Sequence, residues 1–287
     1  MNSNRLIILL LLAIGVTTTA QRSDFLGRSE LTLAAGGMNY IGDLNNQSAF
    51  STPHLAFAAG LRTRIDNRWT LRFEAAYGNI SCEHDYLELR NLSFRSHIYE
   101  GAVTVEFNFR PYGPGATEST WTPYLFGGLG LFHFNPEASY IETDGSEVWV
   151  ALQPLCTEGQ GTPDHLDRKQ YALLQLCMPF GVGFKWRVSK SVTLTAEYSF
   201  RKTWTDYLDD VSTTYVGGDC LIANVDDGEL SASMADRSGE VVEGYVNAVG
   251  IKRGDDSLDD WYTCFRLSVG VSLETLFGWM RSKRCKL

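Results

Sequence analysis

Segments in which apolar and polar side chains alternate recur along the chain, and this pattern limits the possible folds more than any other feature. Within residues 69–78, Trp69 and Phe73 lie on one face of an extended chain, and Arg72 and Glu74 lie on the other. Alternation with a period of two predicts a β-strand. Repeated over segments of about ten residues, it is typical of strands that cross a membrane in a barrel.

The same alternation predicts about eight strands in all. Besides 69–78, they cover residues 29–38, 54–64, 99–110, 122–134, 180–188, 192–201 and 265–273. The links between them alternate in length: the short ones are 65–68, 111–121 and 189–191, and the long ones are 39–53, 79–91, 135–174 and 202–260. Short periplasmic turns and long external loops are typical of outer-membrane barrels. The prediction is therefore an all-β, antiparallel transmembrane β-barrel with long extracellular loops, and the weaker alternative is a secreted soluble β-protein.

The first twenty residues have the composition of a signal peptide. Arg5 precedes an apolar stretch over residues 6–16, and Ala20 is a small residue before a cleavage site at Gln21. The apolar stretch is shorter than the roughly 20 residues that a membrane-spanning helix needs. We therefore divide the chain into a signal peptide (1–20), an outer-membrane barrel (21–275) and a periplasmic basic tail (276–287), in the outer membrane of a Gram-negative bacterium.

The formal net charge of −9 is concentrated in one segment. Residues 203–260 hold fourteen acidic and three basic residues. Such a block disfavours binding to nucleic acid, whose phosphates it would repel, and predicts a solvated external loop. Residues 228–237 within it have helical spacing. The paired acids 209/210, 226/227, 255/256 and 259/260 follow no EF-hand spacing, so solvated charge is favoured over a Ca²⁺ site.

The polar faces of the predicted strands carry charges that hydrocarbon would exclude. In a barrel they point into the lumen, where each buried charge needs a partner. A barrel of eight strands is just wide enough for its own side chains to fill it, so an internal ion-pair network is favoured over a conducting pore. The predicted members of this network are Arg72, Glu74, Glu100, Glu106, Lys185, Arg187, Glu197, Arg201 and Arg266, with Arg62 and Arg64 as further lumen charges.

Catalysis receives little support from the sequence. A nucleophile needs a base within hydrogen-bond reach, and the spacing singles out no partner for any of the five histidines. His97 with Ser93 or Ser96 is the least unfavourable pairing. We therefore predict no enzyme, no catalytic residue, no metal, no cofactor and no small-molecule substrate.

All six cysteines lie in an oxidising compartment if the leader is a signal peptide, which favours disulfides. Threading them on the barrel puts Cys82, Cys156 and Cys220 in external loops, and Cys177 and Cys264 near the outer ends of strands. Cys285 falls in the periplasmic tail, and a barrel wall about 25 Å tall separates it from the others. It therefore has no internal partner. Cys285 with the surrounding Arg281, Lys283 and Arg284 forms the predicted contact with a separate periplasmic protein; the alternative is a free thiol in a frayed tail.

Several segments resemble the small outer-membrane barrels of Bacteroidota that include PorG of the type IX secretion machinery. They are GGMNYIGDL (36–44), RNLSFRSHIYE (90–100), VEFNFRPY (105–112), PYLFGGLGLFHFNP (123–136), PFGVGFKW (179–186), FRKTWTDYLDDVSTTYV (200–216) and KRGDDSLDDWY (252–262). The resemblance implies a component that associates with the periplasmic ring proteins PorK and PorN and is needed for secretion of proteins with a C-terminal sorting domain. It implies no catalytic residues. The chain departs from ordinary barrels at its end, where Phe277 and Trp279 precede a basic tail.

The leading hypothesis from the sequence is thus a barrel that contacts lipid and holds the PorK/PorN ring at its periplasmic end. The alternative is a surface binding or adhesion barrel that acts through its acidic loops.

Overall fold

The chain forms a closed antiparallel barrel of eight strands, as the alternation predicts. The computed structural model describes residues 25–45, 53–82, 89–115, 117–142 and 144–284, the last six without their side chains. Each strand pairs with the next, and β1 pairs with β10 to close the wall. The barrel strands are β1 (Ser29–Ile41), β2 (His54–Arg64), β3 (Trp69–Cys82), β4 (Phe94–Asn108), β5 (Trp121–His133), β8 (Leu174–Arg187), β9 (Val192–Thr203) and β10 (Trp261–Ser272).

The barrel has its apolar side chains outside and its charges inside. Phe73 and Leu129 on the outer wall are 48% and 62% exposed, whereas Arg72 and Glu106 on the inner wall are 2% and 0% exposed. This is the reverse of a water-soluble protein, and it is stable only where the outer wall meets hydrocarbon. The predicted orientation of the alternating faces is confirmed.

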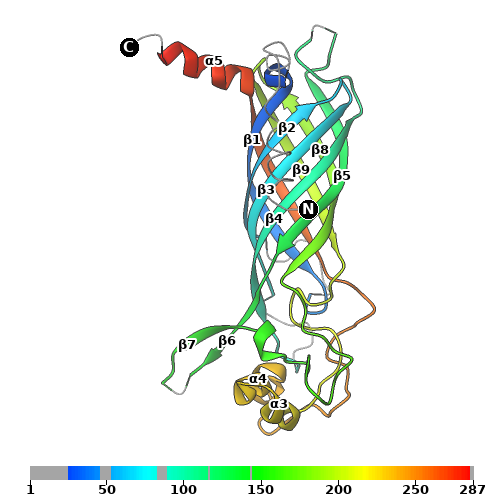
Figure 1. Ribbon diagram of the computed structural model, residues 1–287, viewed down its shortest axis with the longest axis vertical. Helices are drawn as coiled ribbons and strands as arrows, with labels where there is room; N and C mark the ends of the chain where they lie inside the picture. Colours follow the sequence, from blue (N-terminus) through cyan, green and yellow to red (C-terminus); the bar gives the residue numbers. More distant parts are fainter. Residues whose placement is uncertain (1–24, 46–52, 83–88, 116, 143, 285–287) are drawn as a thin grey trace, which may run out of the picture.

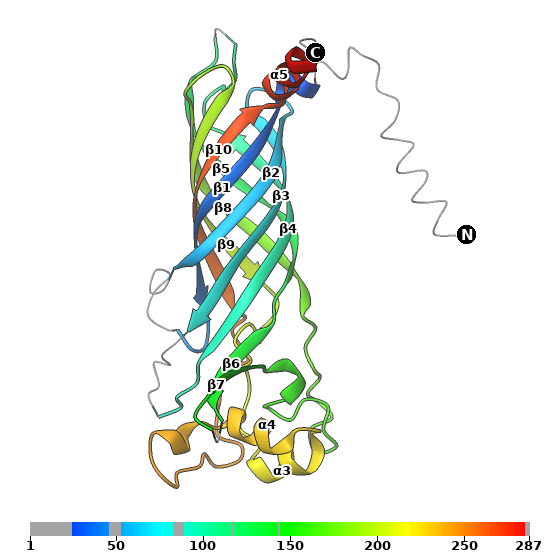
Figure 2. The same cartoon turned by 90° about the vertical axis from the view of Figure 1, so that its left-hand side faces the viewer.

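The short links between strands lie at one end of the barrel and the long links lie at the other end (Figures 1 and 2). Residues 65–68, 109–120 and 188–191 make the short turns at one end. The turn at 65–68 is held by Asp66, whose side chain accepts hydrogen bonds from the backbone N–H groups of Arg68 (2.7 Å) and Trp69 (2.8 Å). The long links gather at the other end, so the short-turn end is periplasmic and the long-loop end is external.

The long links carry further elements. The β5–β8 link holds the hairpin β6 (Pro136–Ile141) and β7 (Glu147–Ala151) and the short 3-10 helix η1 (Gln153–Leu155). The β9–β10 link holds α3 (Gly218–Asn224), α4 (Gly228–Ala235) and the 3-10 helix η2 (Ser238–Glu240). The helix predicted over 228–237 is therefore confirmed as α4.

The outer half of the lumen is apolar and continues into the loops. A column of aromatic rings runs from β5 into the loops: Phe132 and Phe134 are 5.5 Å apart, Phe134 and Tyr171 6.0 Å, and Tyr171 and Tyr207 4.8 Å between ring centroids. Stacked rings at these distances pack favourably beyond the area that they bury. The external loops therefore form a packed cap, defined here as residues 153–173 and 204–260, on the outer end of the barrel.

The chain does not end at the last barrel strand. Helix α5 (Leu273–Arg284) follows β10 directly and leaves the periplasmic end of the barrel sideways (Figure 1). The sequence analysis gave a frayed tail as an alternative for this segment, whereas the structure has a helix through residue 284. Cys285 and the predicted signal peptide with its cleavage site lie outside the described residues.

Candidate functional site

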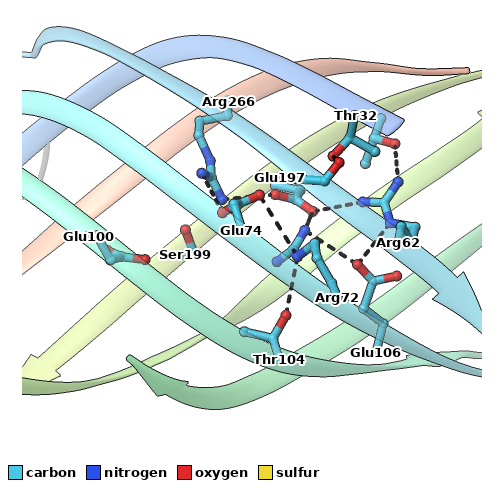
Figure 3. A network of polar contacts seen from close by, with 12 residues as sticks. Thr32, Arg62, Arg72, Glu74, Glu100, Thr104, Glu106, Glu197, Ser199 and Arg266 are labelled. Carbon is cyan, nitrogen blue, oxygen red and sulfur yellow. Dashed lines mark hydrogen bonds and ion pairs between the residues drawn. The ribbon is translucent and has the colours of Figure 1, made fainter. Parts of the chain in front are cut away.

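The inner wall holds a network of buried ion pairs centred on Glu197 of β9 (Figure 3). Its carboxylate contacts the guanidinium groups of Arg72, Arg62 (3.5 Å) and Arg266 (3.3 Å), which come from β3, β2 and β10. The hydroxyl of Tyr124 on β5 donates a hydrogen bond to it as well. One side chain therefore ties together strands from all around the barrel.

Three further acids on the inner wall pair with buried cations. Glu106 lies 3.0 Å from Arg62 and 3.3 Å from Arg72, and Lys185 also contacts it. Glu74 lies 2.7 Å from Arg266. Glu100 forms a separate pair nearer the cap, with Arg201 at 3.0 Å and the Tyr262 hydroxyl at 2.8 Å.

The structure joins most of the predicted lumen residues, with two differences. Arg187 lies outside the network, with its guanidinium carbon 5.6 Å from the centroid of the Tyr112 ring. Arg64 contacts Glu118 of a periplasmic turn at 3.9 Å. Both residues are near the periplasmic ends of their strands, where the lumen opens, and alternation alone does not tell how far along the barrel a charge lies.

The network fills the periplasmic half of the lumen. Arg62, Arg72, Glu106, Lys185 and Glu197 are each at most 4% exposed. Buried charges held by several partners are costly to separate. The arrangement suits a rigid plug, and together with the apolar outer wall it makes this chain an outer-membrane β-barrel that contacts lipid.

The cap has its own buried ionic centre, which the sequence did not predict. Arg253 lies 2.9 Å from Glu158 and donates hydrogen bonds to the backbone carbonyls of Asp210 (2.5 Å) and Ala235 (3.1 Å). Glu158 also accepts hydrogen bonds from the backbone N–H groups of Ser212 and Thr213, each at 2.9 Å. Arg253 thus links the β5–β8 loop to two parts of the β9–β10 loop.

Paired acids of the β9–β10 loop were predicted to be solvated, and for some this is wrong. Asp209, Asp210 and Asp260 are at most 1% exposed. The Tyr40 hydroxyl lies 2.5 Å from Asp209 and 3.2 Å from Asp260, and the backbone N–H of Leu208 donates to Asp260 at 2.9 Å. The prediction failed because it took the loops for open chain, whereas they fold into the cap, where the carboxylates meet donors from β1 and from the loops themselves.

Residues 4–215 match a family described as a domain of unknown function, DUF6089. The chain belongs to this family. No curated protein matches it.

Several solved outer-membrane barrels are similar to this DUF6089 chain. Neisserial surface protein A has 13% identity and a TM-score of 0.40, over 85% of this chain and 96% of its own. The attachment invasion locus protein Ail of Yersinia pestis has 9% identity and a TM-score of 0.39, over 85% and 97%. The outer membrane protein OprG of Pseudomonas aeruginosa has 11% identity and a TM-score of 0.38, over 85% and 96%. Similarity at this level carries no argument about partners or activity.

The least unfavourable histidine–serine pairing from the sequence, His97 with Ser93 or Ser96, does not appear among the described hydrogen bonds of the DUF6089 barrel. His97 Nδ1 lies 2.5 Å from the Asn79 side chain and 3.1 Å from the Tyr77 hydroxyl, and the Ser96 hydroxyl accepts the Asn135 N–H. The structure instead brings Ser81 to His54 at 2.6 Å, from neighbouring strands. Among the described residues no carboxylate forms a hydrogen bond with His54.

No disulfide is shown within the described part of the chain. Cys156, Cys177, Cys220 and Cys264 are free thiols there. Cys177 and Cys264 point into the lumen and are 0% and 1% exposed, which keeps them from loop cysteines. In the described part of the chain no cluster of three His, Cys, Asp or Glu side chains could hold a metal ion. None of the helices within the described ranges is long and apolar enough to cross a bilayer.

The buried cap acids predict that the cap is less stable at high pH. Burial raises the pKa of Asp206 from 3.8 to about 9, and burial also raises the pKa of Asp209 and Asp260. The folded cap then holds these protons more tightly than the unfolded loops do, so the stability they contribute is complete below about pH 4 and is lost as the pH rises to about 9.

The measurement is the urea midpoint for loss of near-ultraviolet circular dichroism, to which the stacked Tyr171 and Tyr207 contribute. We expect a lower midpoint at pH 9 than at pH 5. Asp206→Asn, which mimics the protonated side chain, should reduce this difference. A midpoint that rises with pH would contradict the assignment.

Proposed function

We propose that this barrel is a fixed outer-membrane component of the type IX secretion machinery that contacts the periplasmic PorK and PorN ring through its periplasmic end. The sequence resemblance suggests the machinery. The division into signal peptide (1–20), barrel (21–275) and tail (276–287) belongs to this proposal, with the tail element beginning at Leu273 as α5.

The observation that carries the proposal is the position of α5. The helix projects sideways from the end of the barrel that bears the short turns, and Phe277 on it is 40% exposed. Its last turn carries Arg281 and Arg284, and cations are favoured at a helix C-terminus. A helix with an exposed aromatic residue and a basic end offers a contact surface that the sealed barrel itself lacks.

Charge reversal in the tail tests the proposal. We expect PorK and PorN to co-purify with the barrel in mild detergent, and the triple variant Arg281→Glu/Lys283→Glu/Arg284→Glu to lose them while the barrel stays folded. Lys190→Glu is the matched control, because Lys190 is an exposed cation in a turn at the same end. Cys285→Ser should remove any crosslinked species from non-reducing gels.

Intact secretion in a deletion strain, with no ring protein bound to the wild-type barrel, would overturn the proposal. Retention of the ring by the triple variant but not by Lys190→Glu would move the contact from α5 to the turns.

One observation favours the alternative, a surface binding barrel. Residues 239–252 of the cap are all exposed except Asn247, and they include Val246 and Val249 at 71% and 68% exposed. Asn247 fixes this loop, because its backbone N–H and side-chain amide donate to Asp236 at 2.7 and 2.9 Å. A loop that holds apolar side chains in solvent is typical of an interaction surface. It would be the functional surface if the co-purification fails.

A further inference from the structure

The hairpin β6–β7 leaves one strand edge open. In the sheet, β6 joins β4 at Arg95↔Glu137 and Ser96↔Pro136, and β7 pairs with β6. The sheet order ends at β7, so within the described residues its second edge has no strand beside it. An open edge presents unpaired N–H and C=O groups that can pair with another strand.

The hydrogen-bond pattern tells which backbone groups point outward. The Glu142 N–H donates to the Ser146 carbonyl at 2.9 Å, and the Leu152 N–H donates to the Pro136 carbonyl at 2.8 Å. Since hydrogen-bonded pairs alternate along an antiparallel ladder, Val148 and Val150 bond inward to β6. The backbone groups of Glu147, Trp149 and Ala151 therefore face the open edge.

The edge lacks the proline and the basic residues that commonly protect an edge strand from pairing. Strand β7 reads EVWVA, with no Pro, Lys or Arg, and Val and Trp favour strands. In natural proteins, proline or basic residues, bulges or a covering segment normally protect an edge strand from pairing with another strand.

The hairpin is also held in place. Arg95 on β4 lies 3.1 Å from Glu137, and its guanidinium carbon lies 3.6 Å from the centroid of the Trp149 ring. The two contacts brace both strands of the hairpin against the barrel wall. In Figure 1 the hairpin runs sideways from the barrel at the base of the cap.

We propose that strand β7 pairs antiparallel with β7 of a second copy of this chain, with Trp149 opposite its counterpart and Glu147 opposite Ala151 of the second copy. This register uses all three outward-facing residues on each side, giving about six backbone hydrogen bonds. It also keeps the two Glu147 side chains from lying directly opposite each other, where like charges would repel. This pairing is independent of the secretion role.

The membrane favours a second copy over a soluble strand as the occupant. Two barrels in one membrane hold their hairpins at the same height and pointing sideways, so the two edges meet without a change in the barrels. Confinement of this kind raises the effective concentration of one edge near the other.

Cysteine crosslinking in the native membrane tests both the pairing and its register. The background is the full chain with Cys156→Ser, Cys220→Ser and Cys285→Ser. We expect Trp149→Cys to form a crosslinked dimer on mild oxidation, because opposite residues have Cβ atoms about 4.5–5.5 Å apart. Glu147→Cys is the matched control and should not crosslink, because its counterpart lies four residues along the ladder, about 13 Å away.

A backbone variant separates pairing from chance collision. Ala151→Pro removes an outward N–H and leaves the bonds to β6 intact, so in the Trp149→Cys chain it should reduce the crosslink at least tenfold, whereas Ala151→Ser should not. The heat-induced gel shift of a folded barrel checks that each variant is folded. Equal crosslinking at positions 147 and 149, no crosslink at 149, or an effect of Ala151→Ser equal to that of Ala151→Pro would overturn the proposal.

Discussion

Replacing Glu197 with alanine should lower the free energy of unfolding of the barrel by about 3–5 kcal/mol, the cost typical of removing one partner from a buried ion pair. The Glu197 carboxylate contacts Arg62, Arg72 and Arg266. Without it, these cations would face one another in a lumen from which water is largely excluded. Urea unfolding in lipid vesicles, followed by tryptophan fluorescence, measures the change.

Glu118→Ala is the control for this experiment. Glu118 forms one distant ion pair, with Arg64 at 3.9 Å, and is partly exposed. Pairs of this kind contribute about 0–1 kcal/mol. If the two variants differ by less than about 1 kcal/mol, Glu197 is not the centre of the network.

Replacing Arg253 with alanine should open the cap while the barrel stays folded. The change removes a cation from Glu158 and Asp210 and leaves both acids buried, which again costs about 3–5 kcal/mol. Since each 1.4 kcal/mol is about a tenfold change in an equilibrium, the open cap should become at least a hundredfold more populated. Cleavage by a protease specific for aromatic residues at Tyr171 and Tyr215 measures this, because both are buried in the closed cap (8% and 5% exposed) and become accessible only when it opens.

Lys252→Ala provides the matched control, one residue away. Lys252 is 61% exposed and pairs with Asp255 at the surface, so its removal should leave the cleavage rate nearly unchanged. Equal cleavage of the two variants would show that Arg253 does not hold the cap together.

Most of the barrel could be predicted from the sequence because apolar residues that face lipid alternate with polar residues that face the lumen along each membrane strand. The β2 segment was predicted with both of its observed ends, since His54–Arg64 alternates throughout. Strand β4 begins earlier than predicted, at Phe94, because its outer end rises beyond the lipid and no longer needs an apolar outer face. The membership of the lumen network followed from the same alternation, which puts Arg72 and Glu197 inside.

The cap could not be predicted in this way. Its buried acids, Asp209 and Glu158 among them, depend on donors distant in the sequence, such as Tyr40 of β1 and Arg253 of the cap. Local composition alone therefore predicts that these carboxylates are solvated. The contact between Ser81 and His54 was missed for a similar reason, because it depends on the register of two strands rather than on a motif.

The thiols inside the wall set a condition on assembly. Cys177 and Cys264 are inaccessible once the strands have closed, but the same thiols are open to oxidants while the chain waits in the periplasm. Burial inside the closed barrel, and not a disulfide bond, protects each thiol from oxidation. Whether a thiol is oxidised therefore depends on how soon the barrel closes. Chains that are inserted promptly keep both sulfurs reduced, and delayed chains are the ones at risk of mispaired bridges that no later insertion could accommodate.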